Sequence, residues 1–216
     1  MNTKKLDWKI VLFVCSLVIA IIMGCRQTLG LFLEPVSSFM EDGREFFSFA
    51  IGVQAIIWGC VTFFCGILID KFGPQKVLAF GIISYALGIF LLSNPNSSFT
   101  LFSATSLMGF GLGGAGMATI ISIVGKVAPP NKRSLAMGFA AAAASFGQFA
   151  VVVPTIWMNE HLGWQTSLII LASVTISLLI FLPLLNENNH KNNQNTSFGL
   201  GLKNTLMFSM KERNYL

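Results

Sequence analysis

Long apolar runs alternate with short polar segments along most of the chain. Six of these runs are predicted to be helices, and they cover residues 10–33, 46–69, 75–93, 98–124, 134–158 and 164–185. A helix rises about 1.5 Å per residue, so roughly 20 apolar residues are needed to cross the hydrocarbon of a bilayer. Each run is near that length. The pattern therefore predicts an all-α membrane protein with six transmembrane helices.

The basic residues fall almost entirely on alternate loops. If the N-terminus is cytoplasmic, twelve of them lie inside: Lys4, Lys5, Lys9, Lys71, Lys76, Lys126, Lys132, Arg133 and four residues after position 186. Only Arg44 falls in an outside loop, and Arg26 lies within the first span. Because short loops rich in Lys and Arg stay in the cytoplasm, the sequence predicts a multi-pass protein of a bacterial-type cytoplasmic membrane with both termini inside.

Composition supports a membrane location and excludes several other classes. Apolar residues make up 54% of the chain and charged residues 11%, an unusual mixture for a soluble domain. The net charge of +5 is explained by loops that face anionic lipid, so no nucleic-acid partner is expected. All four cysteines lie in the first two spans, where we expect them to pack as small apolar residues. Neither a metal site nor a cofactor is predicted, and no catalytic constellation indicates an enzyme.

One alternative concerns the N-terminus. Three lysines followed by an apolar run that reaches Cys25 resemble a lipoprotein signal peptide. The apolar core of such a signal is about 7 to 15 residues long, whereas this run continues to Leu33. A complete transmembrane span is therefore the preferred interpretation, and mass spectrometry of the intact N-terminus distinguishes the two.

The spans form two groups of three. The first outside loop, residues 34–45, is acidic, whereas the second, residues 94–97, is a bare turn. The two inside loops, residues 70–76 and 125–133, resemble each other in glycine, proline and basic residues. A 3+3 repeat with a binding site between the repeats is a common transporter plan. Residues 186–216 begin with a polar, Asn-rich stretch and are predicted to be a cytoplasmic linker.

The loop between the second and third spans carries a recognisable motif. Its residues are Gly66, Leu68, Asp70, Lys71, Gly73 and Lys76. They resemble the Gly-x-x-x-Asp-Arg/Lys-x-Gly-x-Arg/Lys signature of the major facilitator superfamily, in the position where that family has it. The resemblance implies a twelve-helix fold, of which residues 1–185 are the N-terminal six-helix half and residues 186–216 lead toward an absent second half. It also implies that Gly66, Asp70, Lys71, Gly73 and Lys76 form a conformational-switch motif.

Further positions resemble one branch of that family, the bacterial monocarboxylate and oxalate/formate porters. They are Gly24, Arg26, Thr28, Gly30, Phe32, Pro35, residues 111–123, residues 145–148 and the pair Gly163 and Trp164. The branch implies secondary active transport of small organic anions, above all monocarboxylates, by alternating access with proton symport or anion exchange. A truncated, non-transporting or regulatory half is the alternative. Drug efflux is less favoured, because the fifth span lacks the proline motif of drug/proton antiporters.

Three polar side chains are candidates for substrate binding. Arg26 is the one charge at membrane depth, where a charge is costly unless it faces a partner or a watery cavity. Gln54 and Gln148 are expected at a similar depth, and two amides beside a guanidinium could surround a carboxylate. The alternative is a structural Arg26 that bonds helix carbonyls or reaches Glu34. The missing second half, a second copy of the chain and protons are the other expected partners.

Glycines in the fourth span satisfy a Gly-x-Gly-x-x-Gly pattern at Gly111, Gly113 and Gly116. The pattern belongs to dinucleotide-binding folds only where a strand precedes it, and no strand is predicted here. We therefore expect Gly109, Gly113 and Gly116 to serve helix packing.

Overall fold

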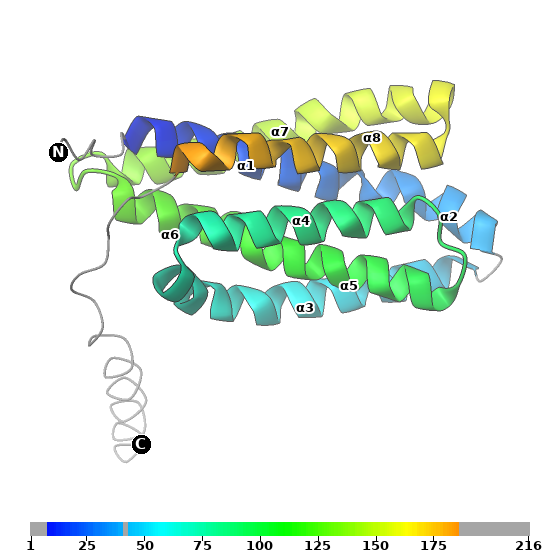
Figure 1. Cartoon of the computed structure of the whole chain (residues 1–216). Coiled ribbons are helices and arrows are strands. Elements are labelled where there is room, and N and C mark those ends of the chain that lie inside the picture. The colour runs from blue at the N-terminus through cyan, green and yellow to red at the C-terminus, as the bar shows by residue number, and fades with distance from the viewer. Residues whose placement is uncertain (1–7, 41–42, 186–216) are drawn as a thin grey trace, which may run out of the picture. The chain divides into compact units, whose positions relative to one another are not determined.

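The computed structural model describes residues 8–40 and 43–185, and every regular element in them is helical (Figure 1). The elements are α1 (Trp8–Thr28), η1 (Leu29–Phe32), α2 (Leu33–Met40), α3 (Gly43–Phe72), α4 (Pro74–Leu92), α5 (Ser98–Ala115), α6 (Met117–Val127), α7 (Arg133–Leu162), α8 (Trp164–Ser177) and η2 (Leu178–Leu185). The predicted linker after residue 185 lies outside the described residues.

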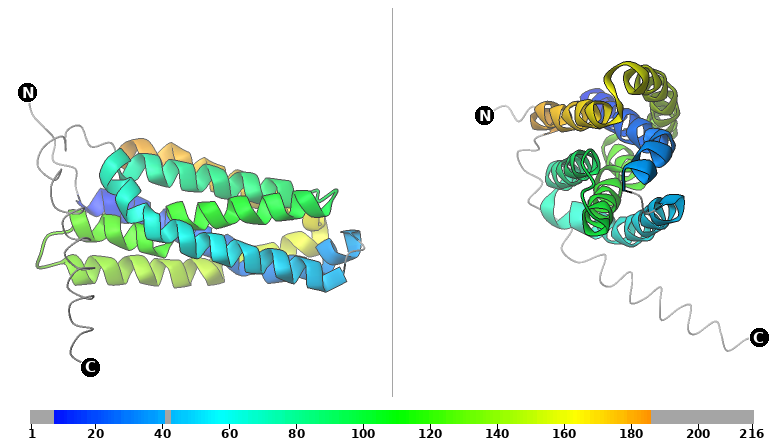
Figure 2. Two further views of the ribbon diagram at one scale, coloured as in Figure 1. Left: turned by 90° about the horizontal axis from the view of Figure 1, so that it is seen from below. Right: turned by 90° about the vertical axis from the view of Figure 1, so that its right-hand side faces the viewer.

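Six helical stretches are long and apolar enough to cross a membrane: Trp8–Met40, Arg44–Phe72, Pro74–Leu92, Ser98–Val127, Arg133–Leu162 and Trp164–Leu185. The prediction of six transmembrane helices is therefore confirmed. The stretches lie side by side along a common axis (Figure 2).

The first outside loop is much shorter than predicted. Residues 34–40 continue as helix α2, and α3 already begins at Gly43. The acidic residues suggested a loop, but Val36 is fully buried, and the Phe39 ring meets Trp164 of α8 edge to face, with ring centroids 5.6 Å apart. Burial of this apolar face stabilises the helix beyond the first span.

The fourth span is broken at Gly116. This residue is extended (φ −83°, ψ −172°), so α5 ends at Ala115 and α6 begins at Met117. The hydroxyl of Thr119 bridges the break by donating to the carbonyl oxygen of Gly113 at 2.8 Å. A discontinuous helix is tolerated at membrane depth where other groups satisfy the freed backbone.

The two groups of three spans share one plan. Elements of the second group begin 90 residues after their counterparts: α5 after α1, α7 after α3 and α8 after α4 (residues 98 and 8, 133 and 43, 164 and 74). Both α3 and α7 contain 30 residues. Each is followed by one glycine with positive φ, Gly73 (86°) or Gly163 (83°), both with ψ 156°. Only glycine adopts this conformation readily, so the same residue type makes both tight turns.

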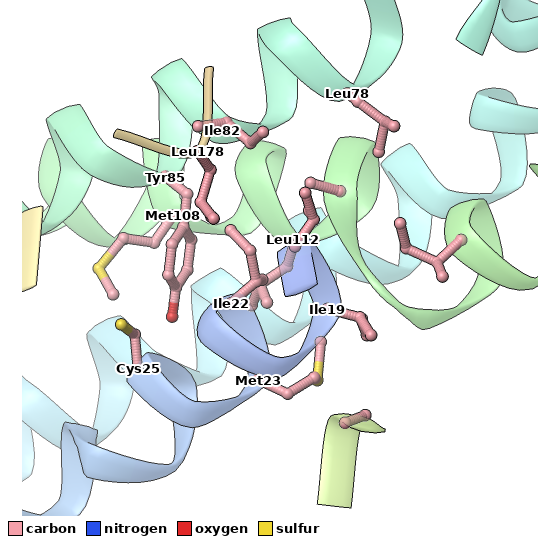
Figure 3. Packing of buried hydrophobic residues seen from close by; sticks show 14 of the residues in the cluster. Ile19, Ile22, Met23, Cys25, Leu78, Ile82, Tyr85, Met108, Leu112 and Leu178 are labelled. Atoms are coloured by element: carbon pink, nitrogen blue, oxygen red, sulfur yellow. The ribbon is translucent and has the colours of Figure 1, made fainter. Parts of the chain in front are cut away.

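Small residues bring the helices into close contact. A Cβ at Gly147 of α7 would lie 2.1 Å from the carbonyl oxygen of Ala20 in α1, and a Cβ at Gly24 would lie 2.4 Å from Val151. Around these contacts the core is apolar, and Ile22, Tyr85 and Leu112 meet in it (Figure 3). The structure corrects one packing expectation, because Cys60 is exposed whereas Cys15, Cys25 and Cys65 are buried.

Candidate functional site

The guanidinium of Arg26 rests on an aromatic ring of a neighbouring span. Arg26 lies near the end of α1 and is half-buried. Its Cζ atom is 4.9 Å from the centroid of the Trp58 ring in α3. A cation over an indole face is attracted by the ring's electron density. This contact explains how the charge is held between the first and second spans without a carboxylate.

Arg26 forms neither of the two ion pairs found among residues 8–40 and 43–185. Arg44 pairs with Glu34 at 3.3 Å, and Lys126 pairs with Asp70. Glu34, the carboxylate considered as a partner for Arg26, pairs with Arg44 instead. The contact with Trp58 uses no hydrogen-bond acceptor, so the N–H donors of Arg26 remain free to bind an anion.

Gln54 lies one helical turn before Trp58, so both side chains are on one face of α3. It is only 3% exposed, and its Nε2 atom finds no hydrogen-bond partner among the described residues. A buried amide donor without a partner is costly. Gln54 therefore offers a hydrogen bond close to the Arg26 and Trp58 pair.

Another buried polar group without a hydrogen-bond partner among the described residues lies in α4. Tyr85 of α4 is fully buried, and its hydroxyl has no hydrogen-bond partner within the described part of the chain. The ring points from α4 toward Cys25 (Figure 3). Sequence reasoning did not select Tyr85, because a tyrosine in an apolar span has no distinctive spacing. Trp58 was also missed, although its position four residues after Gln54 could have revealed it.

Gln148 lies in α7, next to a glycine that contacts α1. Its neighbour Gly147 touches Ala20 of α1, whereas Gly24 touches Val151. Hydrogen bonds within residues 8–40 and 43–185 do not link Gln148 to Arg26 or Gln54. The grouping of Arg26, Gln54 and Gln148 into one binding site stays a prediction.

The motif after the second span lies at the end of the bundle where α3 and α6 finish. Asp70 accepts a hydrogen bond from the ammonium of Lys126, which lies at the end of α6. Lys71 instead lies over the Phe72 ring, 5.2 Å from its centroid. Gly73 makes the turn, and both Gly66 and Lys76 are exposed. The Asp70 carboxylate therefore ties the end of the second span to the end of the fourth.

The candidate packing glycines face α3. A Cβ at Gly109 would lie 2.8 Å from the Gln54 carbonyl oxygen, and a Cβ at Gly113 would lie 2.4 Å from Val61. At Gly116 it would lie 2.1 Å from the Leu112 carbonyl oxygen and 3.4 Å from the indole nitrogen of Trp58. The break at Gly116 is thus directly beside Trp58.

Comparison with known proteins now identifies the family. The sequence profile of the Major Facilitator Superfamily matches residues 10–213, nearly the whole chain. The chain belongs to this superfamily. It is thus a multi-pass membrane protein.

Three named relatives support membership of this superfamily. YcxA of Bacillus subtilis, described as an uncharacterized MFS-type transporter, is 28% identical over 192 residues, which are 83% of this chain and 45% of that protein. The riboflavin transporter RibZ of Clostridioides difficile is 24% identical over 194 residues (86% and 41%). Monocarboxylate transporter 13 of Bos taurus is 28% identical over 165 residues (74% and 37%). All three names describe transporters, and the chain spans less than half the length of each.

Proposed function

We propose that this chain is the N-terminal six-helix half of a secondary transporter for small organic anions, above all monocarboxylates. The observation that carries the proposal is the guanidinium of Arg26, which has aromatic support and no carboxylate partner among the described residues. An arginine binds a carboxylate through two parallel N–H donors. Gln54 would supply a further donor from the same region.

Transport would proceed by alternating access, in which two six-helix bodies rock around a central site. The second body would be a C-terminal half or a second copy of this chain. Asp70, Lys71 and the neighbouring glycines would act as the switch at the cytoplasmic end. Coupling to protons or to a counter-anion would use the substrate itself, a carboxylate at the end of a span, or a residue of the second body. The membrane would be a bacterial-type cytoplasmic membrane.

The test compares two arginines in the assembled transporter. Arg26→Gln should abolish most uptake of labelled lactate, pyruvate, formate and acetate, whereas Arg26→Lys should keep the charge and bind more weakly, because Lys lacks the planar fork of donors. Arg44→Gln is the matched control, since Arg44 is exposed at the bundle end and already paired with Glu34. Normal anion uptake by a folded Arg26→Gln protein would refute the anion site.

A second candidate is transport of a larger heteroaromatic solute. It is favoured by the similarity to a protein named as a riboflavin transporter and by the indole of Trp58 beside the site. In that case labelled riboflavin, not the four monocarboxylates, should be taken up. If neither class of solute is transported by the assembled protein, the alternative of a non-transporting half is supported.

A further inference from the structure

The contact between Arg26 and Trp58 affects how the guanidinium receives an anion. This inference rests on the proposed function. We propose that Trp58 is a positioning residue, which holds the Arg26 guanidinium where it can receive a carboxylate. Arginine has a long side chain with many rotamers, so an unsupported guanidinium would sample many positions. The indole face, 4.9 Å from Cζ, restricts these positions.

The contact leaves the binding groups of arginine available. All five N–H donors of a guanidinium lie in its plane, and the ring attracts the cation through its electron density rather than through a hydrogen bond. A salt bridge to a glutamate would hold the side chain equally well, but would occupy the same donors. An aromatic support therefore suits a site that must bind and release an anion.

Trp58 is itself held in place by the broken fourth span. Its indole nitrogen lies 3.4 Å from the position that a Cβ at residue 116 would take, so the ring packs directly beside the break. Val61, one turn further along α3, packs against Gly113 before the break. The ring thus sits between Arg26 of the first span and the end of α5.

The internal repeat does not duplicate the pair of Arg26 and Trp58. With the shift of 90 residues, position 26 corresponds to Gly116, and position 58 corresponds to Gln148. The second repeat therefore supplies neither a cation nor an aromatic ring at the related positions. A ligand with one anionic group fits this asymmetry, and its remaining part would lie toward Gly116 and Gln148.

The experiment separates positioning from folding. In the assembled transporter, Trp58→Leu should raise the KM for the monocarboxylate that the wild type transports by about 2- to 30-fold, the range expected for loss of a cation–π contact, with kcat changed much less. Trp58→Phe keeps an aromatic face and should restore most of the affinity. Trp58→Met serves as a second non-aromatic variant if Trp58→Leu does not fold. Trp157→Leu is the control, because Trp157 is exposed on α7 and stacks on His161.

A double-mutant cycle completes the test. Trp58→Leu should add no further loss in an Arg26→Gln background, because Trp58 acts through Arg26. If Arg26→Gln loses anion uptake but Trp58→Leu leaves KM unchanged, the positioning role is wrong and the proposed function stands. Equal losses for Leu, Met and Phe would also contradict it. If Arg26→Gln transports normally, the proposed function itself fails.

Discussion

The two three-span repeats have the same helical plan but different chemistry. Helices of equal length, α3 and α7, end at equivalent glycines and lead directly into α4 and α8. The charge and the aromatic ring of the candidate site, however, belong to the first repeat, at Arg26 and Trp58. Helix lengths and turns are fixed by membrane thickness and glycine conformation. Polar residues inside the bundle are not constrained in this way, so one repeat can carry the binding groups alone.

The turns at the two ends are held differently. Near Gly73, the carboxylate of Asp70 pairs with Lys126. Near Gly163, the corresponding turn is held by ring contact between Phe39 and Trp164. An ion pair at the surface can be exchanged for another partner at little cost, whereas an edge-to-face contact between two aromatic rings has no such ready replacement. The contact between Asp70 and Lys126 is therefore the better candidate for one that opens during transport.

The largest expected effect concerns the closest contact between helices. Gly147→Ala should lower the free energy of unfolding by about 3 kcal/mol or more, since the new methyl would meet the backbone of Ala20 and overpacking of this kind is not relieved by a side-chain shift. Gly113→Ala, in the fourth span, would meet Cγ1 and Cβ of Val61 at 2.4 and 2.6 Å and should be destabilising for the same reason. Thermal unfolding in detergent measures both.

Gly138→Ala is the matched control for that comparison. Gly138 lies in the same helix as Gly147, and a Cβ there would meet nothing within 4 Å. The substitution should be neutral or stabilising by up to about 1 kcal/mol, because alanine has the higher helix propensity. A Gly147→Ala protein as stable as Gly138→Ala would show that the α1 and α7 contact is looser than described.

The second prediction tests the equivalence of the two turns. Gly73→Ala and Gly163→Ala should each destabilise the bundle by about 1–3 kcal/mol, because both residues have positive φ with ψ near 156°, where a side chain is strained. Equal losses in thermal unfolding experiments would support a repeated turn. A loss at only one of the two positions would show that the backbone plan is not shared.

The smallest effect on stability is expected at Asp70. Asp70→Asn should cost no more than about 1 kcal/mol, since both partners of its ion pair are roughly half-exposed. In the assembled transporter the same change should nevertheless reduce turnover, if Asp70 is part of the switch. Glu160→Gln, at the position 90 residues later in the second repeat, is the control and should leave turnover unchanged.

A charge exchange tests the partner directly. Asp70→Lys combined with Lys126→Asp should recover part of the turnover lost by either change alone. Failure of the exchange, together with normal turnover of Asp70→Asn, would limit the ion pair to a structural role.

Sequence reasoning succeeded where one physical rule dominates. Six apolar runs predicted six spans, because every residue in a bilayer must be apolar or paired internally. The site was predicted less completely. Arg26 stood out as a charge in an apolar run, and Gln54 as a polar residue nearby, but Trp58 is an ordinary residue for a membrane helix. Its contact with Arg26 joins residues 32 positions apart and depends on how α1 and α3 pack.

By itself, the sequence determined the number of spans and, through the motif at residues 66–76, the family. The spans follow from local hydrophobicity, and the motif is read directly from neighbouring residues. Only the tertiary structure decided that Glu34 pairs with Arg44, that Asp70 pairs with Lys126, and that Trp58 supports Arg26. Such pairings depend on the register between helices distant in sequence, and that register is set by close contacts such as Gly147 against Ala20.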